Sequence, residues 1–187
     1  MQIKKLAIGV ITLSCLAALS LGGCSKSDKQ ATEPNANQGG APTAMQGGPN
    51  NATLINDLKA RLKEKPNDAS VYWALGDAYL ESRQYNEAVE NYKKAIEITP
   101  NESDIYNELG LALHYLGRSP EGLKYIEQGI KKNPYNQRIW LTKGFITAYG
   151  MADLEGAKAA WEKARALNPE SQVGKAAAEY LAQLNKK

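Results

Sequence analysis

The residues whose side chains could do chemistry are few, and they lie far apart in the sequence. The two cysteines, Cys15 and Cys24, both fall near the N-terminus, so neither a disulfide framework nor a thiolate metal cluster is expected farther along the chain. His114 is the single histidine, and six residues of helix would place it on a different face from Glu108, a candidate acid–base partner. No GxSxG, P-loop, HExxH or paired-cysteine motif occurs. We therefore expect no enzyme, no cofactor, no metal site and no small-molecule substrate.

The N-terminal segment has the pattern of an export signal. Two lysines precede a largely apolar run over residues 6–21, which is typical of a secretory signal peptide. An uncleaved transmembrane helix is the alternative, because residues 6–23 are near the lower length limit for spanning a bilayer. The run ends in LGGC, residues 21–24, which resembles the bacterial lipobox. That resemblance implies alkylation of Cys24 by diacylglycerol, cleavage just before it and acylation of the new amine.

The lipobox resemblance also implies a location. Two or more acyl chains give stable attachment to a membrane, so we expect an extracytoplasmic lipoprotein with a signal peptide over 1–23. Ser25 follows the cysteine in place of the aspartate that retains enterobacterial lipoproteins in the inner membrane, which favours the outer membrane if the cell has one. In a cell without one, the chain would sit on the outer face of the cell membrane. Residues 24–50 are rich in Gly, Pro, Asn and Gln without apolar periodicity, and they predict a disordered linker after the lipidated cysteine.

The charge balance gives no indication of a nucleic-acid partner. The 23 basic and 20 acidic residues leave a net charge of +3, and removal of the two lysines in the signal peptide would reduce it to +1. A nucleic-acid-binding protein would be expected to concentrate basic residues on one face.

Four prolines recur at a nearly constant spacing after the linker. Pro66, Pro100, Pro134 and Pro169 are 34, 34 and 35 residues apart, and a period of this length indicates a repeat array. The units align at Tyr72, Tyr106 and Trp140; Gly76, Gly110 and Gly144; Ala88, Gly122 and Ala157; Tyr92, Ile126 and Trp161; and Ala95, Gly129 and Ala164. These positions resemble the tetratricopeptide repeat, over residues 68–169 and three repeats.

The glycine of each unit lies on the apolar face of a predicted helix. A glycine inside a helix costs about 1 kcal/mol relative to alanine, and Gly76 shares its face with Tyr72, Leu75 and Tyr79. We therefore expect it to make room for a side chain of the second helix in the same repeat. The third unit departs from the pattern, because Lys143 replaces the usual leucine and one extra residue lies near residues 149–151.

The resemblance implies an all-α fold, a right-handed superhelix of three repeats with flanking N- and C-terminal helices. Eight helices are expected within a repeat domain over residues 51–187. The first, over residues 52–64, should pack Leu54, Ile55, Leu58 and Leu62 onto the array. In the middle repeat, Ser119 before a proline predicts an N-terminal helix cap. The predicted repeats are about 69–102, 103–136 and 137–171, followed by a capping helix over 172–185.

In this family the first helix of each repeat lines a concave groove that holds a peptide. The matching positions here are Trp73, Asp77, Leu80, Asn107, Leu111, His114, Leu141 and Phe145. Relatives that clamp a C-terminal carboxylate use lysine, asparagine and arginine at these positions. Apart from Asn107 this chain does not, so an apolar groove is expected. The resemblance thus implies a lipid-anchored adaptor that docks a protein or peptide partner, for example in pilus, secretion or envelope assembly. A self-associating spacer on the membrane surface is the alternative.

Overall fold

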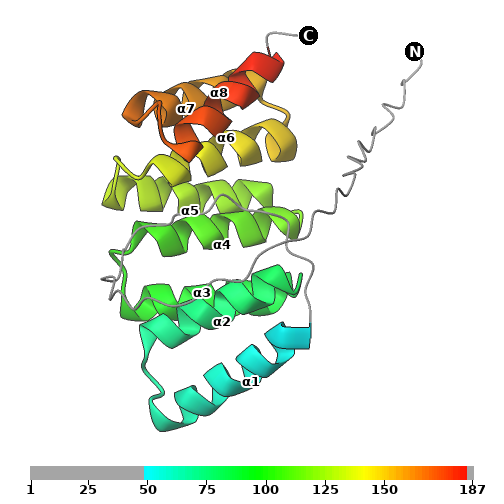
Figure 1. Ribbon diagram of the computed structural model, residues 1–187, viewed down its shortest axis with the longest axis vertical. Helices are drawn as coiled ribbons and strands as arrows, with labels where there is room; N and C mark the ends of the chain where they lie inside the picture. Colours follow the sequence, from blue (N-terminus) through cyan, green and yellow to red (C-terminus); the bar gives the residue numbers. More distant parts are fainter. Residues whose placement is uncertain (1–48, 185–187) are drawn as a thin grey trace, which may run out of the picture. The chain divides into compact units, whose positions relative to one another are not determined.

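The structure is a computed structural model that describes residues 49–184, and these residues form eight α-helices (Figure 1). The helices are α1 (Pro49–Glu64), α2 (Ala69–Glu81), α3 (Tyr85–Ile98), α4 (Ser103–Tyr115), α5 (Ser119–Lys132), α6 (Gln137–Met151), α7 (Leu154–Leu167) and α8 (Gln172–Leu184). The predicted signal peptide, Cys24 and most of the predicted linker lie outside the described residues. The expected all-α fold with eight helices is confirmed for the part described.

The helices stack in the order of the sequence. Each helix packs against the next one, and the pairs α2–α3, α4–α5 and α6–α7 have the most extensive contacts. Figure 1 shows α1 at one end of this stack and α7 and α8 at the other. Each pair therefore corresponds to one of the three predicted repeats.

The glycine of each unit lies where the two helices of a pair approach closely. A Cβ atom added at Gly76 would be within 2.9 Å of three ring atoms of Tyr92, and one at Gly144 would be within 2.7 Å of three ring atoms of Trp161. Gly110 of the middle pair is equally restricted. Cβ contacts shorter than 3.0 Å are essentially never observed, so a side chain at these positions would force the facing side chain of the partner helix to shift. The expectation that glycine makes room for the second helix is confirmed.

Hydrogen bonds connect the aromatic residue of one repeat to the end of the preceding one. The Tyr106 hydroxyl donates to the carbonyl oxygen of Pro100 at 2.9 Å, and Trp140 Nε1 donates to the carbonyl oxygen of Pro134, also at 2.9 Å. Each bond spans the turn between two helix pairs. The proline that ends a repeat thus also provides an acceptor for the next repeat.

The third pair accommodates both departures from the repeat pattern. The helix α6 has 15 residues, whereas α2 and α4 have 13, and it ends before Ala152, whose φ of 56° lies in the left-handed region. Lys143 is half-buried, and its Nζ lies 3.7 Å from Glu127 on α5 and 5.6 Å from the ring centre of Trp140. Its alkyl chain can therefore pack at a position where Leu75 is buried, while its charge reaches the edge of the helix pair.

The flanking helices pack at the ends of the stack. On α1, Ile55 and Leu58 are buried, but Leu54 is 45% exposed, so the prediction that Leu54 packs onto the array is wrong. The helix begins at Pro49, three residues before the expected start, and ends at Glu64 as expected. At the other end, Tyr180 of α8 stacks on the ring of Trp161 with centroids 4.7 Å apart.

Candidate functional site

The eight residues predicted for a binding face come from α2, α4 and α6, the first helices of the three pairs. These helices are adjacent, because α4 packs against both α2 and α6. Asn107 is buried, and the other seven are half-buried: Trp73, Asp77, Leu80, Leu111, His114, Leu141 and Phe145. Partly exposed apolar side chains on three neighbouring helices leave surface that a second molecule can cover.

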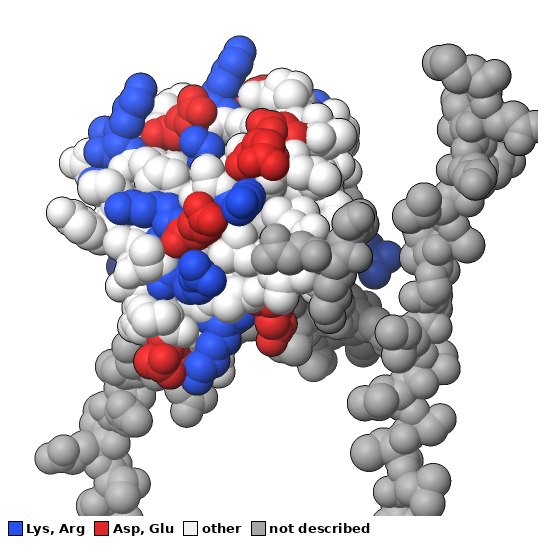
Figure 2. All heavy atoms as spheres, turned by 90° about the horizontal axis from the view of Figure 1, so that it is seen from above, with Lys and Arg blue, Asp and Glu red and all other residues white. Residues whose placement is uncertain are grey.

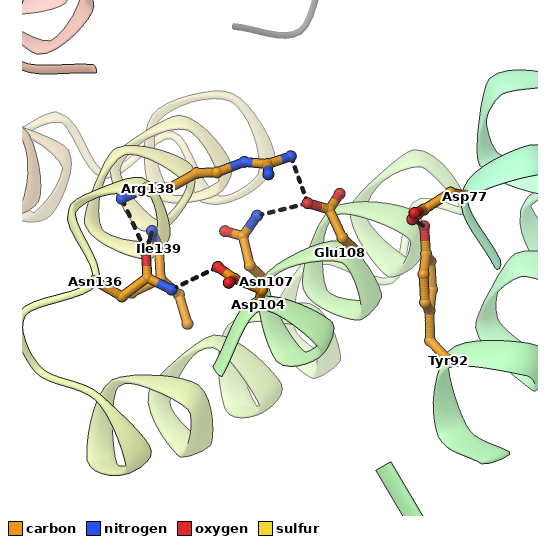
Figure 3. A network of polar contacts seen from close by, with 8 residues as sticks. All are labelled: Asp77, Tyr92, Asp104, Asn107, Glu108, Asn136, Arg138 and Ile139. Atoms are coloured by element: carbon orange, nitrogen blue, oxygen red, sulfur yellow. Dashed lines mark hydrogen bonds and ion pairs between the residues drawn. The ribbon is translucent and has the colours of Figure 1, made fainter. Parts of the chain in front are cut away.

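A network of polar side chains joins α4 to α6 (Figure 3). Arg138 Nη2 forms an ion pair with Glu108 Oε1 at 2.5 Å, and the same oxygen accepts a hydrogen bond from Asn107 Nδ2 at 3.2 Å. In the same network, Asn136 Nδ2 donates to Asp104 Oδ1 at 2.7 Å, while the Asn136 oxygen caps the first turn of α6. Asn107 Oδ1 is buried and has no hydrogen-bond partner among the described residues. One acceptor in the network thus remains unsatisfied.

Burial governs the electrostatics of the two acidic residues nearest to the middle of this face. Burial raises the pKa of Glu108, the Arg138 guanidinium partly offsets this effect, and the negative charge of Asp77 adds to it. Burial likewise raises the pKa of Asp77, although the Tyr92 hydroxyl donates to its Oδ1 at 2.8 Å and lowers the pKa. An additional positive charge nearby would therefore stabilise the ionised form of both carboxyl groups.

Arg138 influences acids on two helices. Its positive charge lowers the pKa of Glu108 on α4 and also that of Asp77 on α2. Glu81, at the end of α2, acts in the opposite direction and raises the pKa of Asp77. The single guanidinium is therefore shared between two carboxyl groups, and it contacts only one of them directly.

Aromatic rings form a continuous row beyond the polar network. The row, called the aromatic row below, consists of Tyr85, Tyr115, His114, Phe145 and Tyr149, with successive ring centroids 5.1, 5.7, 5.3 and 5.0 Å apart. Tyr115 and Tyr149 are 47% and 60% exposed. The row therefore presents accessible ring surface from α3, α4 and α6.

His114 has a structural role within this row. Its Nδ1 lies 2.9 Å from Ser119 Oγ, and burial lowers its pKa, which favours the neutral ring. Ser119 was expected to cap α5, but Arg118 occupies the N-cap position and makes no side-chain cap bond, so that prediction is wrong. The Ser119 hydroxyl pairs with the histidine instead, which fixes the imidazole edge-on to Phe145.

Three other predicted residues also contact the buried core. Trp73 and Leu80 contact the buried cluster of the first two repeats, and Leu141 contacts the buried cluster around Trp161. Sequence reasoning did not include Glu108 and Arg138 among the site residues. A signal was present for Glu108, because the aligned positions hold the small residues Ala74 and Thr142, and an acid at such a position requires a partner.

Other surface features lie away from this face. Two hollows of about 570 and 400 Å³ are lined by residues of the α1–α2 turn with Ile98, and by Tyr72 with polar residues of α3. Within residues 49–184, no group of three potential metal-ligating side chains is close enough to hold an ion, and no helix has the length and hydropathy needed to cross a membrane. At the end of the stack seen in Figure 2, acidic and basic side chains are interspersed.

Comparisons with known sequences identify the repeat. A family model described as TPR repeat matches residues 76–117. Hsp70-Hsp90 organizing protein 3 of Arabidopsis thaliana is 27% identical over 131 residues, which cover 66% of this chain and 23% of that protein. DnaJ homolog subfamily C member 7 of Homo sapiens is 32% identical over 91 residues, or 49% of this chain and 17% of that protein. The chain thus matches less than a quarter of the length of these relatives.

Solved structures share the arrangement of helices. A thermophilic TPR protein of Thermus thermophilus superimposes with a TM-score of 0.63 at 22% identity, covering 73% of this chain and 75% of that one. MamA gives a TM-score of 0.58 at 20% identity, with 71% and 85% covered. The first TPR of Spaghetti, bound to the HSP90 peptide SRMEEVD, gives 0.56 at 18% identity, with 64% and 94% covered. The eight described helices are therefore packed as about three to four tetratricopeptide repeats.

Proposed function

Because these helices are packed as tetratricopeptide repeats, we propose that the chain is an adaptor that docks a segment of a partner protein across α2, α4 and α6. The observation that carries this proposal is the row of partly exposed aromatic rings beside the half-buried side chains of the same three helices. Aromatic side chains dominate the binding energy of many protein interfaces. Apart from Asn107, the predicted side chains on these helices remain partly exposed among the described residues, so a partner can contact them.

The relatives support this mode of binding without identifying the partner. One solved relative holds the peptide SRMEEVD, which contains three acidic residues and one arginine. On the present chain, Arg138 is paired with Glu108, and Asp77 lies on the neighbouring helix. Acidic side chains at this face disfavour an acidic ligand, so we propose the same docking geometry with a different partner.

We propose further that Cys24 anchors the chain to a membrane outside the cytoplasm. The lipobox-like residues 21–24 and the preceding apolar run support this anchor. The residues between Cys24 and α1 would act as a tether of about 25–30 Å, taken as a flexible coil. An adaptor on such a tether would present its docking face to proteins near the membrane surface, which suits a role in pilus, secretion or envelope assembly.

A self-associating spacer remains the second candidate, and one observation favours it. Tyr149, Met151 and Leu154 are 60%, 45% and 45% exposed around the turn between α6 and α7. Apolar side chains gathered at one turn can pack against a second copy of the chain. The two candidates differ in whether the chain captures another protein or itself.

The test is a pair of truncations on the proposed docking face. Trp73→Ala with Phe145→Ala should abolish capture of partner proteins from membranes, because both aromatic side chains contribute to that face. Tyr135→Ala is the matched control, since this aromatic residue is 78% exposed in the turn before α6. Circular dichroism would verify that the helices persist, because Trp73 also contacts the buried core.

Two outcomes would contradict the adaptor. Capture that survives the double substitution would place the binding site on another surface. A wild-type chain that captures no protein and sediments as an oligomer would support the spacer.

A further inference from the structure

We infer that the segment docked on this face is basic: a lysine or arginine of the partner lies beside Glu108 and Asp77, and an apolar residue of the same segment lies on the aromatic row. This inference rests on the proposed docking function and specifies the chemistry of the partner. It is carried by the charges of the face and the position of the aromatic row.

The charges of the network are unbalanced. Among the residues drawn in Figure 3, Asp77, Asp104 and Glu108 are acidic, whereas Arg138 is basic. Arg138 forms its ion pair with one oxygen of Glu108, Oε1, and Asn107 donates a hydrogen bond to the same oxygen. Asp77 receives its hydrogen bond from the neutral Tyr92 hydroxyl. A cation of the partner on the α2 side of Glu108 could form ion pairs with the carboxylates of Glu108 and Asp77.

The aromatic row defines a second feature of the partner. Glu108 and His114 are six residues apart on α4, which corresponds to about 9 Å along the helix axis and about 120° around it. The axial distance alone requires about three residues of extended chain. The partner segment should therefore carry a basic residue and an apolar residue at least about three positions apart. An acidic residue at the first position would instead face Asp77 and Glu108 and be repelled.

A random nonapeptide library displayed on phage, selected against the full chain, would test the inference. We expect the selected peptides to contain lysine or arginine at least about three positions from an apolar residue. Replacing the arginine of a selected peptide by the neutral isostere citrulline should weaken binding about tenfold or more, since a hydrogen bond to a charged group is lost. Fluorescence anisotropy with the labelled peptides would measure this change.

Variants of the chain connect the effect to the proposed residues. Asp77→Asn keeps an acceptor for the Tyr92 hydroxyl, so the fold should persist, and it should weaken the arginine peptide more than the citrulline peptide. Glu108→Gln should act in the same direction. The exposed Glu162 on α7 is the matched control, because Glu162→Gln makes the same charge change on another helix and should leave both affinities unchanged.

The outcomes separate this inference from the docking function itself. Selected peptides that are acidic or uncharged, but are lost on Trp73→Ala with Phe145→Ala, would overturn the basic partner and leave the docking face in place. Basic peptides whose affinity is unchanged by Asp77→Asn would overturn the proposed location. Binding that appears only after Lys26→Gln with Lys29→Gln would overturn the external partner, because the chain's own basic residues would then be the occupant. Failure to select any peptide with either the wild-type chain or the Lys26→Gln, Lys29→Gln variant would contradict both proposals.

Discussion

Gly76→Ala should destabilise the first repeat even though alanine is the better helix former. The new methyl carbon would lie within 2.9 Å of three ring atoms of Tyr92. That ring has little freedom to move, because Tyr92 is fully buried and its hydroxyl is bonded to Asp77 at 2.8 Å. Overpacking of this kind costs about 1–3 kcal/mol, and the gain in helix propensity is about 1 kcal/mol. The net loss should be on the order of 1 kcal/mol, equivalent to a fall of about 2–4 °C in the unfolding midpoint.

A double-mutant cycle tests the stated cause of this loss. Tyr92→Val removes the ring atoms that the new methyl group would meet. In that background Gly76→Ala should therefore stabilise the chain, by up to about 1 kcal/mol from helix propensity alone. Urea unfolding of the four proteins, followed by circular dichroism, gives the coupling free energy. A Gly76→Ala substitution that stabilises both backgrounds equally would show that the glycine does not limit helix packing.

The remaining predictions concern the anchor and the buried acid. Cys24→Ala should abolish incorporation of a radiolabelled fatty acid, since the proposed acyl chains are attached through this residue; a variant that is still fully acylated would contradict the anchor. Burial raises the pKa of Glu108 in the folded chain above its ordinary value of 4.5. Its contribution to the free energy of unfolding should therefore be greatest at a pH below 4.5, and it should fall as the pH rises through the pKa of the folded chain. Glu108→Gln should flatten that decline in urea unfolding measured from pH 4 to pH 8, and an unchanged pH profile would exclude Glu108 as its source.

Much of the fold could be predicted because repetition makes local patterns unambiguous. The positions of Gly76, Gly110 and Gly144 each fall at the same place in the period, and the structure places each against the second helix of its pair. A glycine on an apolar helical face costs stability, so its recurrence indicates a packing requirement. The third repeat could be aligned for the same reason, despite Lys143 and the longer α6.

The polar side of the candidate site could not be predicted in this way. The pairing of Glu108 with Arg138 joins residues 30 positions apart in neighbouring repeats, and hydrophobic periodicity carries no information about such a pair. Ser119 illustrates a second difficulty, because its hydroxyl can serve either the helix backbone or a nearby side chain. The position of His114 decided between them, and only the packed structure reveals that position.

The bonds from Tyr106 and Trp140 to the prolines of the preceding repeats bear on how the chain unfolds. In a linear array each repeat contacts mainly its neighbours, so stability is approximately a sum of repeat terms and coupling terms between neighbours. These two bonds contribute to the coupling terms, because each joins an aromatic residue of one repeat to the end of another. Strong coupling makes the array unfold as one unit, and weak coupling lets the end repeats open first. A partner lying across α2, α4 and α6 would touch three repeats at once and would therefore make the transition sharper as well as raising its midpoint.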